Sequence, residues 1–103
     1  MAKQFVRSGL ANRFRVELLD GDFVEVDTIA GDAMQWERVH KKLWQENVSP
    51  TSMLWTAWRA LRRENRTNES TFEAWVDRVR DFEVEADVDD DELDDEDPTR
   101  PAL

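Results

Sequence analysis

The clearest alternation of apolar and polar residues lies between residues 13 and 28 and predicts a β-hairpin. Apolar side chains occupy every second position on both sides of a turn: Phe14, Val16, Leu18, Val24 and Val26. A period of two is typical of strands with one buried face. A two-residue turn at Asp20-Gly21 would place Val16 opposite Glu25. We favour instead a three-residue loop, Leu19-Asp20-Gly21, with Gly21 at a left-handed bulge position. In that register apolar residues lie opposite apolar residues and opposite charges face each other: Val16 with Val24, Phe14 with Val26, and Arg15 with Glu25.

A helical pattern dominates the stretch Ser49–Arg66. Ser49 suits the N-cap, Pro50 suits the first helical position, and Asn65 tolerates the left-handed geometry that often ends a helix. One face carries apolar residues at helical spacing: Leu54, Ala57, Trp58 and Leu61, widened by Met53, Trp55 and Ala60. Another face carries arginines: Arg59, Arg62, Arg63 and Arg66. We predict a helix over residues 50–65, whose wide apolar stripe is the centre of a small core, a docking surface, or both.

Two further helices are predicted on either side of this one. The first covers about residues 32–47, with Thr28 or Asp32 as its cap. Its apolar face follows helical spacing: Ala33, Trp36, His40 and Leu43, flanked by Val39 and Trp44. The other covers residues 71–82, where Ser70 and Glu73 fit a capping box. Its apolar face is equally regular: Phe72, Trp75, Val76, Val79 and Phe82.

Together these elements predict a mainly helical α+β fold, in which an N-terminal β-hairpin precedes a three-helix bundle. Residues 13–82 would form a single small domain after a flexible arm at residues 1–12. Charge separates the last part of the chain, because residues 83–97 include 11 acids while residues 1–82 carry 13 basic and 13 acidic side chains. A segment this acidic cannot bury enough apolar surface to offset the conformational entropy that it would lose on folding. Residues 83–103 are therefore predicted to be a disordered acidic tail.

Groups that could carry catalysis or bind a metal are few. His40 is the single histidine, no nucleophile is marked near it, and the sequence has no cysteine. Counted from Asp87 as an EF-hand loop, position six is Glu92 and position twelve is Pro98, so the calcium pattern fails. No glycine falls in a phosphate-binding pattern, and no apolar run approaches the ~20 residues of a membrane span. We expect a non-enzymatic protein with no cofactor or metal, and with neither a membrane nor a nucleic acid as partner.

The whole pattern resembles the tail assembly chaperones of long-tailed, siphovirus-type bacteriophages, especially those of actinobacterial hosts. The matching features lie between Arg13 and Asp97: the hairpin Phe14–Val26, Trp36-Glu37 and Trp44, the run Met53–Trp58 with Arg62-Arg63, the run Phe72–Trp75 with Val79, and an acidic tail that ends in prolines. The resemblance implies that this chain is the short chaperone product. It also implies a longer product, made by ribosomal frameshifting.

In that family both products coat the tape measure protein, keep it soluble and help tail tube subunits polymerise around it. The resemblance thus implies as partners the tape measure protein and, through the longer product, the tail tube protein, and leaves self-association open. It places the protein in the host cytoplasm and outside the mature virion. Two alternatives remain: a structural tail or head–tail connector protein retained in the virion, and an acidic inhibitor that mimics nucleic acid through Asp87–Asp97.

A chaperone for a long helical client needs an apolar groove that can hold a helix. Aromatic residues and methionine are enriched at protein interfaces. The candidate client-binding residues are therefore Trp36, Trp44, Met53, Trp55 and Trp58. We expect at least one of Trp44, Trp55 and Trp58 to be partly exposed.

Overall fold

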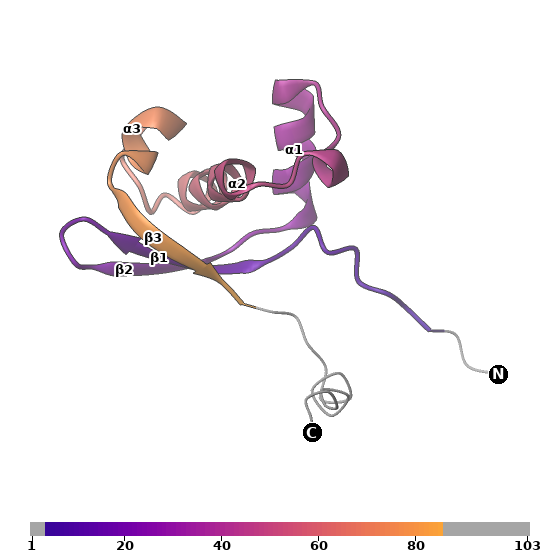
Figure 1. Cartoon of the computed structure of the whole chain (residues 1–103), viewed down its shortest axis with the longest axis horizontal. Helices are drawn as coiled ribbons and strands as arrows, with labels where there is room; N and C mark the ends of the chain where they lie inside the picture. Colours follow the sequence, from indigo (N-terminus) through magenta and orange to yellow (C-terminus); the bar gives the residue numbers. More distant parts are fainter. Residues whose placement is uncertain (1–3, 86–103) are drawn as a thin grey trace.

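The computed structural model describes residues 4–85, and in this range the chain has an α+β fold. A three-stranded antiparallel sheet carries the helices on one face only (Figure 1). Its strands lie in the order β2-β1-β3: β1 (Arg13–Leu18), β2 (Phe23–Asp27) and β3 (Val79–Val84). The helical elements are α1 (Ala30–His40), the 3-10 turn η1 (Trp44–Glu46), α2 (Pro50–Arg63) and α3 (Phe72–Val76).

The pairing of β1 with β2 confirms the register expected from the alternation. Phe14 lies opposite Val26, Val16 opposite Val24, and Arg15 opposite Glu25. The loop closes where the Leu18 N–H donates to the Asp22 carbonyl over 2.9 Å, and Gly21 has a φ of +95°. Glycine adopts this left-handed geometry without the steric cost that a Cβ would bring.

The prediction of a third helix over residues 71–82 is wrong after Val76. The predicted three-helix bundle is therefore wrong as well. The chain turns after α3 and enters β3, which pairs with the free side of β1. Phe82 and Val84 alternate with acidic residues and cover Phe14, whose ring centroid is 6.1 Å from that of Phe82. The α3 cap is Thr71, whose Oγ1 accepts from the Ala74 N–H, rather than Ser70.

The predicted first helix over residues 32–47 is also wrong at its end. α1 stops at His40, and Lys41 takes a left-handed conformation with φ +58°. The Glu37 carboxylate then accepts from the Trp44 N–H over 2.7 Å, which turns the chain back and buries Trp44 in η1. Leu43, expected on the apolar face, is 59% exposed as a result.

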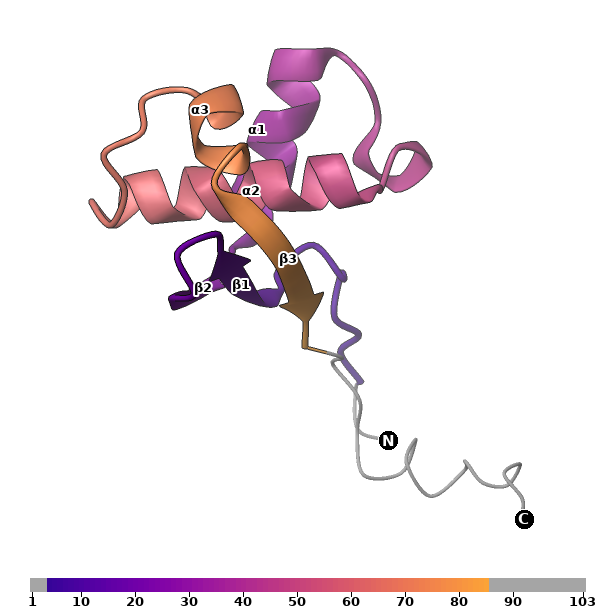
Figure 2. The same ribbon diagram turned by 60° about the vertical axis from the view of Figure 1, so that its left-hand side comes forward.

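The α2 helix forms where its sequence predicts it. The Ser49 Oγ accepts from the Ser52 N–H, the Ser49 N–H donates back to the Ser52 Oγ, and Asn65 has φ +58° beyond the last turn. Figure 2 shows α2 lying across the sheet. Its buried face shares one core with Phe14 and Val16 of the central strand and Val26 of β2, all of them buried: Leu54, Ala57, Ala60 and Leu61.

The other face of the sheet is charged, and no helix formed by residues 4–85 covers it. Arg13 pairs with Asp27 at 3.0 Å, and the Arg15 guanidinium lies 4.4 Å from the centre of the Phe23 ring. Within the described range, no helix is both long enough and apolar enough to cross a membrane. The predicted domain end at residue 82 falls inside β3, and the part of the acidic tail after Glu85 lies outside the described residues.

The extent of β3 generates a first prediction about truncated chains. A chain that ends at residue 82 loses the pairing of Arg15 with Glu83 and the hydrogen bond from the Glu85 N–H to the Arg13 carbonyl. It also loses the Val84 side chain beside Phe14 on the neighbouring strand. We expect it to be about 2–4 kcal/mol less stable than a chain of residues 1–85, from ~1 kcal/mol per ladder bond and one apolar side chain. Thermal unfolding followed by circular dichroism measures the difference, and equal Tm values would contradict the role of β3.

Candidate protein-binding surface

A buried carboxylate joins the start of α1 to the second half of α2. The Asp32 side chain is 1% exposed, and its Oδ2 accepts from the Ile29 N–H over 2.9 Å. Its Oδ1 lies 2.5 Å from a terminal guanidinium nitrogen of Arg63 and 3.5 Å from the Arg59 Nε. Ile29 is the N-cap and has no side-chain acceptor, so Asp32 satisfies its N–H from inside the helix. This arrangement, the Asp32 ion-pair cluster, positions α1 against α2.

An unbroken series of aromatic contacts crosses the helical layer. Its seven rings include every tryptophan of the sequence, and neighbouring centroids lie 4.6 to 6.3 Å apart. In order they are Trp44 from η1, Trp36 and His40 from α1, Trp55 and Trp58 from α2, and Phe72 and Trp75 from α3. We call this series the aromatic row. It connects the two flanking helices across the outer side of α2.

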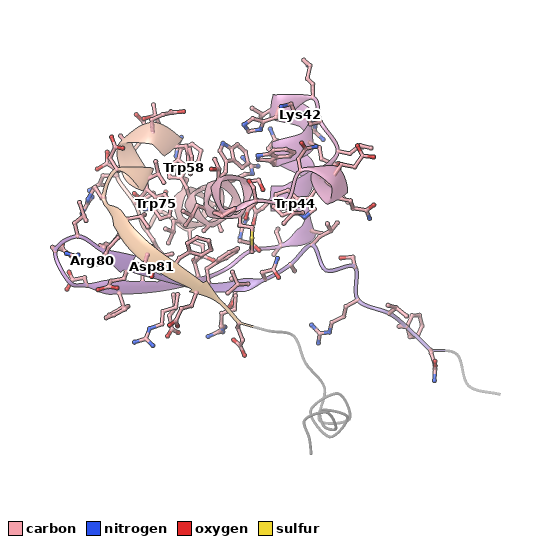
Figure 3. The ribbon with its side chains drawn as sticks, viewed as in Figure 1. Lys42, Trp44, Trp58, Trp75, Arg80 and Asp81 are labelled. Atoms are coloured by element: carbon pink, nitrogen blue, oxygen red, sulfur yellow. The ribbon has the colours of Figure 1, made fainter. Side chains whose placement is uncertain are left out.

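The aromatic row is buried at its ends and open in its middle. Trp44 and Trp36 are only 5% and 6% exposed and pack with Ala33 in a second small core, and Trp75 is 4% exposed in the main one. Trp55 and Trp58 are half-buried. Figure 3 shows Trp58 farther from the sheet than Trp75. The expectation of a partly exposed indole therefore holds for Trp55 and Trp58, not for Trp44.

The five candidate residues thus divide between core and surface. Trp36 and Trp44 belong to the second core, and the half-buried Met53 packs against both cores. Trp55 and Trp58 are also half-buried and pack against the second and the main core respectively, and the rest of each ring lies on the outer side of α2. This side also carries Arg62, whose guanidinium carbon lies 5.5 Å from the centre of the Trp58 ring, and a shallow hollow is lined by Trp58, Arg59, Arg62 and Arg63. We call Trp55, Trp58, Arg59 and Arg62 the α2 outer surface.

The arginines of α2 and Arg66, which follows the helix, are engaged in the fold. Arg62 donates to the Ser70 carbonyl over 3.1 Å, and Arg66 donates to the Glu25 carbonyl over 2.6 Å. The indole N–H of Trp58 donates to the Glu69 carbonyl over 3.2 Å and orients the ring. A phosphate would have to compete with these contacts.

The geometry around the histidine favours a structural role in the aromatic row. The His40 Nδ1 lies 2.9 Å from the Trp36 carbonyl oxygen, and its ring stacks on Trp36 and meets the edge of Trp55. Among residues 4–85, no group of three or more His, Asp and Glu side chains is arranged to hold a metal ion. The surface offers apolar area and positive charge, which is the chemistry of protein binding.

Sequence reasoning missed the partners of Asp32 and the place of Phe72 and His40 in the aromatic row. The spacing of Arg59 and Arg63, four residues apart on one helix face, was the available signal for the ion-pair cluster. It could not identify the acid, because Asp32 lies 31 residues from Arg63.

Comparisons with protein-family models, with curated proteins and with solved structures found no match. The surface is therefore interpreted from its own chemistry.

The Asp32 ion-pair cluster generates a second prediction. Asp32→Ala removes the acceptor of one Arg63 N–H and of the Ile29 N–H, and it removes the counter-charge beside the buried Arg59 Nε, which has no hydrogen-bond partner among the described residues. We therefore expect a loss of about 2–4 kcal/mol in the free energy of unfolding. The matched control is Asp27→Ala, which removes an exposed carboxylate paired with Arg13 and should cost under ~1 kcal/mol. Urea unfolding of both variants measures the difference. Similar small losses in both would show that the cluster contributes little.

Proposed function

We propose that this chain is a bacteriophage tail assembly chaperone that binds the tape measure protein, keeps it soluble and assists polymerisation of the tail tube. The observation that carries the proposal is the open middle of the aromatic row, where Trp55 and Trp58 are half-buried between α1 and α3. The resemblance of the sequence to that family supplies the identity of the client. The proposed role is non-enzymatic.

The chemistry of the α2 outer surface suits a helical client. A tape measure protein is a long helical protein with exposed apolar stripes, and an amphipathic helix binds by laying its apolar face on aromatic and aliphatic side chains. Indoles provide a large contact area with few rotatable bonds, so they lose little entropy on binding. Arg59 and Arg62 lie on the same side of α2, and without giving up their contacts in the fold their positive charge would add long-range attraction to a client stripe flanked by Asp or Glu.

Further elements of the proposal concern place and partners. The chaperone acts in the host cytoplasm and leaves before the virion is complete. Contact with the tail tube protein is made through the longer product. Like-charge repulsion between the acidic segments that follow β3 would keep a coated filament dispersed.

Co-expression with the tape measure protein of the same genome tests the binding surface. We expect Trp55→Ala to reduce the tape measure protein recovered with the chaperone in the soluble fraction. Truncation of an interface aromatic typically costs ~1–2 kcal/mol, so affinity should fall about 5- to 30-fold. The matched control is Phe23→Ala, which removes an exposed aromatic ring from the charged face of the sheet. Circular dichroism verifies that both variants fold.

Three outcomes separate this proposal from its alternatives. Equal recovery with Trp55→Ala and Phe23→Ala would remove the α2 outer surface as the binding site. Detection of the chain in purified virions by mass spectrometry would favour a connector or structural tail protein. Full client recovery with residues 1–85 would make the acidic segment accessory, whereas an activity that resides in that segment alone would favour a nucleic-acid mimic.

A further inference from the structure

The two edges of the sheet are unequally protected, and the β2 edge is covered. Because the Leu18 N–H donates to the Asp22 carbonyl, the even-numbered residues of β2 face β1 in the ladder. The carbonyls of Glu25 and Asp27 therefore point outward. The guanidinium groups of Arg66 and Arg63 lie across this edge and donate to these two carbonyls over 2.6 and 3.5 Å.

The β3 edge has no such cover within the described residues. The Glu85 N–H donates to the Arg13 carbonyl, so the odd-numbered residues of β3 face β1 and the backbone groups of Phe82 and Val84 point outward. The one side-chain contact recorded for these groups is local, from the Phe82 N–H to the Asp81 carboxylate. An uncovered edge is a template for another strand.

The N-terminal arm, residues 4–12, presents a segment that suits this template. Phe5 and Val6 are 93% and 92% exposed. The base of the arm is fixed, since Leu10 packs on the core of Trp36 and Trp44, and the Asn12 carbonyl accepts from the Thr28 N–H over 2.8 Å. Both views show the arm leaving the body from this anchor (Figures 1 and 2).

Charge and pattern are complementary between the arm and β3. Along the outer face of the sheet β3 presents Asp81 and Glu83, followed by Glu85, whereas Phe82 and Val84 face the helices. Residues 3–12 include no acid, and within them Lys3, Phe5 and Arg7 alternate with Gln4, Val6 and Ser8. A register that places Val6 beside Phe82 and Val84 also places the basic residues beside the acids. Pairing of β3 with a second β3 would oppose acid to acid.

We propose that the β3 edge is a docking site for the N-terminal arm of a second copy of this chain, which adds residues around Phe5-Val6 as a fourth strand. Each copy then donates one arm and accepts one arm, so the contact closes as an exchange between two copies or continues as a larger ring or an open chain. Arg7 lies near Glu85 of its own chain, but Phe5 and Val6 are almost fully exposed and so are not docked on their own β3. We therefore take a neighbour's β3 as their partner. The proposal stands independently of any client.

Cysteine cross-linking of the full chain tests this contact directly, because the natural sequence has no cysteine. Tagged Val6→Cys protein is mixed with untagged Val84→Cys protein and treated with a short bismaleimide. Docking raises the effective concentration of the two thiols, so we expect about tenfold or more cross-linked heterodimer than in the control mixture of Val6→Cys with Glu25→Cys. The control places the thiol on the arginine-covered β2 edge. Equal yields in the two mixtures would overturn the proposal.

Sedimentation velocity supplies an independent measurement that needs no cross-link. Arg7→Glu should weaken self-association about tenfold and Glu83→Lys in the same chain should restore it, because the pair then attracts with its signs exchanged. Glu46→Lys, on the exposed turn η1, is the control for net charge. Absence of concentration-dependent association in the unmodified chain would overturn the proposal. A Val6→Cys, Val84→Cys double variant that cross-links within one chain would equally do so, since the arm would then dock on its own body.

Discussion

The pairing of Asp32 is the interaction on which the helical layer depends. A carboxylate so deeply buried is costly unless opposite charge and hydrogen bonds compensate it, and here they come from α2 and from the first turn of α1. The cluster therefore fixes the first turn of α1 on the C-terminal half of α2. With α1 held there, His40 meets Trp55, and the second core connects to the first. The half-buried ring of Trp55 is thus positioned through His40 by the buried charge that holds α1 on α2.

The sheet imposes a second constraint, which explains why the last element is a strand. Phe14 and Val16 lie on the central strand and are fully buried, so β1 needs neighbours on both sides and a helix above. The hairpin partner β2 supplies one side and α2 the cover. Residues 79–84 supply the other side, at the expense of the helix that their spacing would also allow.

The sequence predicted correctly the elements whose structure depends on residues close to one another in the chain. The hairpin register follows from alternation and from the match of Arg15 with Glu25, and α2 follows from its caps. Residues 72–82 were assigned to one helix because the spacing of Val79 and Phe82 fits a helical period of 3.6 as well as a strand. What makes residues 79–84 a strand is the unpaired side of β1, which lies far away in sequence. The end of α1 depended on a side-chain acceptor, Glu37, that no periodicity marks. Among the site residues, the sequence could not separate the buried Trp36 and Trp44 from the half-buried Trp55 and Trp58, because the burial of each indole depends on contacts between elements that no local pattern marks.

The pairing of the first strand with the last has a consequence for the order of folding during synthesis. β1 and β2 can pair as soon as both are made, but β1 must wait for β3 across the whole helical segment. At ~5–20 residues per second, the interval between completing β2 and starting β3 is about 3–10 s. During that interval the hydrogen-bonding groups of β1 on its second side are open to other chains, including nascent copies on neighbouring ribosomes. The rate of translation through the helical segment would therefore affect the fraction of chains that fold as monomers, in which β1 pairs with β3 of the same chain.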